Sequence, residues 1–189
     1  MRQFNFMRGA ALVLVAAFSL GTAQAGTISG VLEFTGEVSA IGSGGLDGAV
    51  GLSFTNGFIT TFADGTFATA GIAAGSTGSL EDFFFDPLSP SPVLSFLTID
   101  FDPGPGKFSF DLEAVEIADQ GETFLVLTGT GTLSGTGLGS ESYDFAMSID
   151  GFGDLVAFSG VISPTVIPVP GALVLFGSGL MALGLRRRS

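Results

Sequence analysis

Carboxylates are the side chains of this sequence that could carry out chemistry. Two groups of them lie close together along the chain: Asp100, Asp102, Asp111, Glu113 and Glu116 around one expected turn, and Asp150 and Asp154 around another. Carboxylate oxygens are ligands that Ca²⁺ prefers, and a carboxylate pair can hydrolyse a glycosidic bond. The spacing fits no EF-hand loop, and no sequence feature marks an acid of raised pKa or a sugar cleft. We therefore interpret both groups as solvated acidic faces and assign no metal ligand or cofactor.

Other familiar catalytic side chains are missing. The sequence contains no histidine and no cysteine, which excludes the usual zinc sites and the Ser-His and Cys-His nucleophile pairs. The glycine-rich run Gly129-Thr130-Gly131 lacks the lysine and the following helix that a phosphate-binding loop requires. We expect a protein that is not an enzyme and needs no cofactor.

Charge is distributed unevenly along the chain. All eighteen acidic residues lie between Glu33 and Asp154, whereas Lys107 is the only basic residue in that region, which gives it a formal charge of −17. Such a field repels nucleic acid and anionic lipid and favours cations. Nucleic acid is therefore excluded as an expected partner.

Residues 26–162 show the alternation of apolar and polar residues that is typical of half-buried strands. In residues 142–149, for example, Tyr143, Phe145, Met147 and Ile149 alternate with polar or small residues. About eight such strands are separated by glycine-rich turns, and no helical periodicity appears between them. We predict an all-β domain, either an antiparallel β-sandwich or a flattened barrel, and we interpret the abundant phenylalanines, twenty in the whole sequence, as core filling.

Local signals predict three further features of this domain. Asn56-Gly57 lies between two alternating runs, a pattern typical of a β-hairpin that joins residues 50–54 to residues 58–62. Asp64-Gly65 predicts another turn. The apolar positions of residues 107–117 change phase, which predicts a β-bulge near Ala114.

The N-terminal 25 residues have the composition of a secretory signal peptide. Arg2 and Arg8 precede the apolar run 9–20, and Ala23 and Ala25 form a small-x-small cleavage site. We expect export through the Sec translocon and removal of residues 1–25 by signal peptidase.

The C-terminal end has three parts in a fixed order. Residues 163–170 form a proline-rich linker that ends in Pro168-Val169-Pro170, residues 171–185 are apolar, and Arg186, Arg187 and Arg188 follow. The uncharged stretch 167–185 reaches roughly 28 Å as a helix, close to the thickness of the hydrocarbon core. We predict a transmembrane helix within residues 171–189, with the arginines acting as a stop-transfer signal on the cytoplasmic side.

The same order of parts resembles the PEP-CTERM sorting signal of Gram-negative bacteria, in its variant whose motif reads Val-Pro-Leu-Pro-Ala. The resemblance rests on Pro168, Val169, Pro170 and Gly171, the small-residue-rich apolar stretch and the terminal arginines, and it covers about an eighth of the chain. It implies processing by an exosortase, a membrane-embedded cysteine transpeptidase-like enzyme.

The resemblance implies an exported protein that passes through an inner-membrane intermediate and then reaches the cell surface or the extracellular matrix, where exopolysaccharide is a further candidate partner. Two alternatives remain open. The domain could be an adhesive module that binds calcium or glycan, or the tail could be a permanent membrane anchor that no enzyme cuts.

Overall fold

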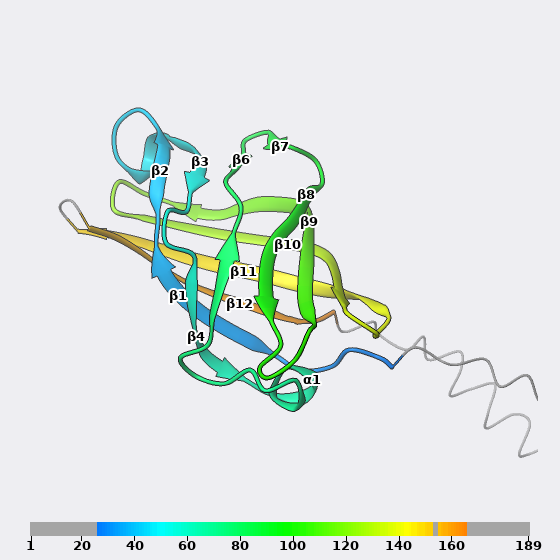
Figure 1. Cartoon of the computed structure of the whole chain (residues 1–189). Helices are drawn as coiled ribbons and strands as arrows, with labels where there is room; N and C mark the ends of the chain where they lie inside the picture. Colours follow the sequence, from blue (N-terminus) through cyan, green and yellow to red (C-terminus); the bar gives the residue numbers. More distant parts are fainter. Residues whose placement is uncertain (1–25, 153–154, 166–189) are drawn as a thin grey trace, which may run out of the picture.

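Eight strands close into an antiparallel barrel (Figure 1). The computed structural model describes residues 26–152 and 155–165. In the order in which neighbours pair, the barrel strands are β1 (Leu32–Glu37), β12 (Leu155–Pro164), β11 (Ser140–Phe152), β10 (Phe124–Gly135), β9 (Lys107–Gln120), β8 (Val93–Asp100), β5 (Thr77–Leu80) and β4 (Phe58–Ala63). Strand β4 pairs back to β1 and closes the ring. The prediction of an antiparallel all-β fold is confirmed, and of its two forms the structure adopts the barrel.

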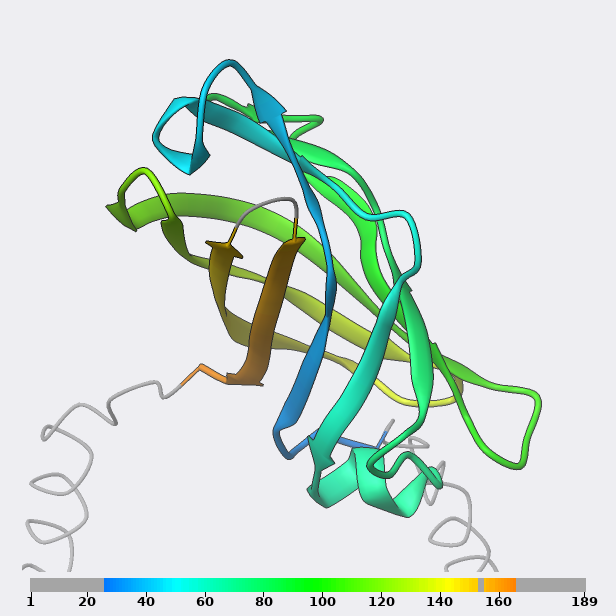
Figure 2. The same ribbon diagram turned by 90° about the vertical axis from the view of Figure 1, so that its left-hand side faces the viewer.

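A second, smaller sheet lies over one end of the barrel (Figures 1 and 2). Its strands are β2 (Ser39–Gly42), β3 (Ala49–Ser53), β6 (Phe83–Phe85) and β7 (Leu88–Ser89). The 3₁₀ turn η1 (Leu46–Gly48) ties this sheet to the barrel, because the Leu46 N–H donates a hydrogen bond to the Glu122 carbonyl at 3.1 Å. The short helix α1 (Gly65–Thr69) lies at the opposite end.

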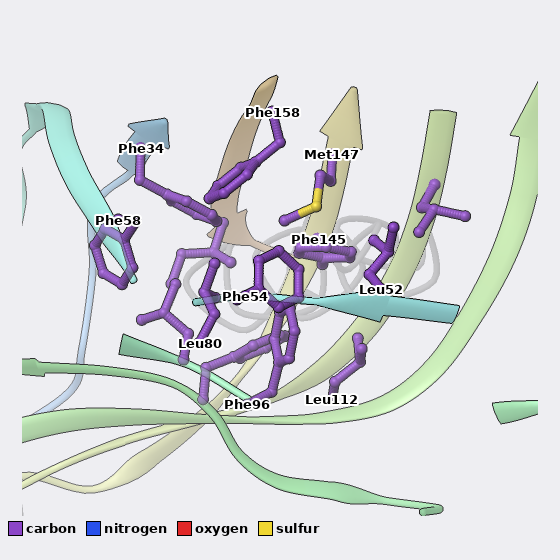
Figure 3. Close-up of a cluster of buried hydrophobic side chains, with 14 of the residues drawn as sticks. Phe34, Leu52, Phe54, Phe58, Leu80, Phe96, Leu112, Phe145, Met147 and Phe158 are labelled. Carbon is purple, nitrogen blue, oxygen red and sulfur yellow. The ribbon is translucent and has the colours of Figure 1, made fainter. Parts of the chain in front are cut away.

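Phenylalanine side chains fill the barrel interior (Figure 3). Phe96 is fully buried, and its ring centroid lies 5.2 Å from that of Phe83, 5.4 Å from that of Phe145 and 6.2 Å from that of Phe54. These contacts join strands of the barrel to the second sheet. At the other end, Phe67 of α1 is fully buried as well. The interpretation of the phenylalanines as core filling is confirmed for most of them.

The hairpin prediction at Asn56-Gly57 is wrong. Strand β3 pairs with β2 and β6, whereas β4 pairs with β1 and β5, so the two strands on either side of the turn do not pair with each other. Gly57 does adopt a positive φ of 68°, as the turn requires. The turn leads the chain from the second sheet into the barrel.

Two other local predictions have different outcomes. The bulge near Ala114 is confirmed, because Thr130 pairs with Ala114 and Gly131 pairs with Leu112, which leaves Glu113 unpaired in the register. The turn at Asp64-Gly65 is instead the start of α1, a five-residue helix that is too short to show a helical period in the sequence.

The barrel extends two residues beyond the expected domain boundary at residue 162. Ser163 pairs with Asp144 and Pro164 pairs with Tyr143, so these residues belong to β12 and not to the linker. The expected signal peptide, the rest of the linker and the expected transmembrane helix lie outside the described residues. Within residues 26–152 and 155–165, no helix is long and apolar enough to cross a membrane.

Candidate functional site

The sorting and cleavage residues identified in the sequence lie outside the part of the chain that the structure describes. They are Ala23, Ala25, Pro168, Val169, Pro170, Gly171, Arg186, Arg187 and Arg188. The structure does describe the residues from which both segments extend, Gly26 and Thr165.

Both ends of the described body lie toward the same end of the barrel (Figure 1), Gly26 at the turn between β10 and β11 and Thr165 beside β11. Gly26 forms a parallel bridge with Leu138, and its carbonyl accepts a hydrogen bond from the Gly139 N–H at 3.0 Å. The Thr165 N–H donates to the Ser142 carbonyl at 3.1 Å. The two ends, far apart in the sequence, therefore lie toward the same end of the barrel but at different points on it.

The carboxylates around the expected turns do not assemble into a metal site. No group of three or more Asp or Glu side chains suited to a metal ion occurs within residues 26–152 and 155–165. Asp111 instead accepts a hydrogen bond from the Ser95 N–H at 2.6 Å, and Glu113 accepts one from Thr132 Oγ1 at 2.7 Å. Asp154 lies outside the described residues.

The glycines of Gly129-Thr130-Gly131 allow β9 and β10 to approach closely. A Cβ on Gly131 would lie 2.1 Å from the Asp111 carbonyl oxygen, and one on Gly129 would lie 2.2 Å from that of Ala114. Neither position has room for a side chain. The run is therefore a feature of strand packing within β10, which continues to Gly135.

A groove of about 460 Å³ lies on the outer face of the barrel across β9, β10, β11 and β12. The strand register arranges its outward side chains in two rows. The first row contains Ala114, Thr130, Asp144 and Ser163, and the second contains Glu116, Thr128, Ala146 and Val161. The volume falls within the range of about 300–1,000 Å³ that is usual for ligand pockets.

Small residues make this face hollow. Ala114 and Ala146 present only a methyl group to the groove, and Gly129 between the two rows has no side chain. The bulge at Glu113 brings Ala114 and Glu116 to the outer face of β9, since it reverses the phase of the strand at that point. The bulge thus supplies one side of the groove.

The groove combines hydroxyl groups with negative charge. Thr128, Thr130 and Ser163 contribute hydroxyls, and Glu116 and Asp144 contribute carboxylates. Asp144 Oδ1 accepts a hydrogen bond from Thr165 Oγ1 at 2.9 Å, which orients the carboxylate along the rim. None of the described residues that line the groove is basic.

No protein-family model, curated protein or solved structure matches this chain. The sequence did not identify this site because its eight outward residues come from four strands that extend from residue 107 to residue 164. Only the register brings them together.

Proposed function

We propose that this protein is exported to the cell surface or extracellular matrix and carries a C-terminal PEP-CTERM-like sorting signal that an exosortase removes. The order of parts at the C-terminal end carries the proposal: the motif Pro168-Val169-Pro170-Gly171, an uncharged apolar stretch and three terminal arginines. Its partners are the Sec translocon, signal peptidase, the inner membrane during transit and the exosortase. We propose no catalytic activity for the body itself.

The position of the two body ends supports this proposal. A precursor held by a signal peptide and by a C-terminal helix has both attachments in the same membrane. Gly26 lies at the β10–β11 turn and Thr165 lies beside Ser142 of β11, toward the same end of the barrel, so that end of the body can face the membrane. The opposite arrangement, with the ends on opposite faces, would require a long connecting segment.

The short distance between the body and the motif gives further support. Thr165 is hydrogen-bonded to β11, and Gly171 follows six residues later, a reach of at most about 20 Å even when fully extended. Because proline disfavours a regular helix, we expect Pro168 and Pro170 to leave this backbone accessible to a protease at the outer face of the inner membrane. Cleavage there would leave every described strand intact.

Processing in the native host tests the proposal. Replacing both Pro168 and Pro170 with Ala should let helix extend through the cleavage region, so that uncut precursor accumulates in the inner membrane. The matched control replaces Pro103 and Pro105, which lie in an exposed turn of the body, with Ala. This variant should be processed like the wild type.

Variants of the three terminal arginines test the orientation of the tail. Replacing Arg186, Arg187 and Arg188 with Ser should weaken membrane stop and misroute the precursor, whereas Lys107→Ser in the body should not. Deleting the exosortase of the host should reproduce the uncut form. If wild-type protein remained in the inner membrane with its tail, the permanent-anchor alternative would replace the proposal.

A further inference from the structure

The groove on the outer face of β9–β12 has the chemistry of a binding site, and we propose that it binds a polysaccharide chain that carries free amino groups. This assignment goes beyond the sorting proposal and does not depend on whether the tail is cut. It rests on the hydroxyls, the carboxylates and the closed backbone of this face.

The hydroxyl groups that line the groove are available to a ligand. Within residues 26–152 and 155–165, no hydrogen bond joins the side chains of Thr128, Thr130 or Ser163 to another protein group, whereas Thr132 and Thr165 nearby donate to Glu113 and Asp144. A hydroxyl can donate and accept at once, so it matches the hydroxyls of a sugar. Three such groups line one groove.

The charge of the groove favours a cationic ligand. Glu116 and Asp144 lie two strands and one row apart, roughly 12 Å by ordinary sheet spacing. Within the part of the chain that the structure describes, no basic side chain lines the groove, and Lys107, the only basic residue of the body, lies at the far end of β9. The groove therefore repels uronic acids and phosphate, and it attracts ammonium groups spaced along a chain.

The strands in the middle of the groove have no free edge. A peptide that joins a sheet as an extra strand needs an edge with unpaired N–H and C=O groups. β10 pairs with β9 and β11, and β11 pairs with β10 and β12, so the middle of the groove offers no such edge. A ligand here must be recognised by side chains alone, which suits the hydroxyls and amines of an amino sugar better than a peptide backbone.

Titration calorimetry on the full chain in detergent, or on the released form from the host, tests the assignment with three probes. A glucosamine pentamer should bind, its fully N-acetylated counterpart should bind at least about tenfold more weakly, and a galacturonate pentamer should not bind. Ala146→Phe should abolish binding because it fills the groove without altering the charge. Ala74→Phe, in an exposed loop, is the matched control and should bind as the wild type does.

Further variants separate the groove from the general negative field. Glu116→Gln together with Asp144→Asn should weaken binding of the glucosamine pentamer at least about tenfold. As the control, Glu81→Gln together with Asp100→Asn removes the same charge from other exposed positions and should change this binding less than about twofold. Thr130→Val and Ser163→Ala remove hydroxyls with little change of volume. They provide a second test of the groove if Ala146→Phe does not fold.

Two outcomes would overturn the assignment. In the first, the two double variants weaken binding of the glucosamine pentamer equally, and Ala146→Phe, Thr130→Val and Ser163→Ala still bind it. The attraction would then be a diffuse one to the negatively charged body as a whole. A lysine pentapeptide that bound as tightly as the glucosamine pentamer, and that Ala146→Phe also abolished, would mean an amine site without preference for sugar.

Discussion

Thr165 Oγ1 donates a hydrogen bond to Asp144 Oδ1 at 2.9 Å and so joins the last described residue of the body to the rim of the groove. The Thr165 N–H donates a hydrogen bond to the carbonyl of Ser142, which lies on β11 with Asp144. Cleavage between Pro168 and Gly171 would leave Thr165 in place. We therefore expect the groove to be the same in the precursor and in the processed form.

Phe96 should contribute strongly to stability. Its side chain is fully buried among four other aromatic rings, and Phe96→Ala should lower the free energy of unfolding by about 3–5 kcal/mol. Phe62 is 46% exposed, so Phe62→Ala should cost less than about 1 kcal/mol. Urea denaturation compares the two variants, and equal losses would contradict this core.

Tyr143 should make the fold sensitive to alkali. Burial, followed by the charges of Glu141 and Asp64, raises the pKa of Tyr143 from 10.0 to about 12. The fold therefore favours the protonated phenol, and this contribution is complete below pH 10 and is lost as the pH rises to 12. The loss should reach roughly 2–3 kcal/mol.

The titration of Tyr143 can be measured directly. This residue is the only tyrosine of the sequence, and tryptophan is absent, so phenolate absorbance reports its titration alone. Its hydroxyl has no hydrogen-bond partner within the described residues. Tyr143→Phe should therefore fold with unchanged or higher stability and should lose stability less steeply between pH 10 and 12. A midpoint near pH 10 in the folded protein would show that the hydroxyl is solvated.

Cations should stabilise the body through screening alone. The body has a formal charge of −17, and no carboxylate cluster for a metal occurs within residues 26–152 and 155–165. Sodium chloride should raise the melting temperature by roughly a few degrees, and calcium should act no better than magnesium at equal ionic strength. A large shift specific to micromolar calcium would indicate a metal site instead.

Alternation along single strands was predictable from the sequence. Tyr143, Phe145, Met147 and Ile149 are all buried, because each strand with one solvated face must turn every second residue inward. The bulge near Ala114 was predictable for the same reason, since an extra residue reverses that phase. In β8 the alternation fails at Phe96, which is buried next to Ser95 with its positive φ of 53°.

Pairing between strands was not predictable in the same way. Asn56-Gly57 specifies a turn with positive φ, but it does not specify which strand the chain joins after the turn. The groove depends on pairing at three interfaces in register, from Ala114 to Ser163. A shift of one residue at any interface would turn its hydroxyls inward, so no single stretch of sequence contains the site.

The mass of the intact protein purified from its own host tests the central claim most directly. We predict a surface or matrix form that begins at Gly26 and ends between Pro168 and Gly171. A released form that still carried Leu173 to Ser189 would contradict processing of the tail by an exosortase.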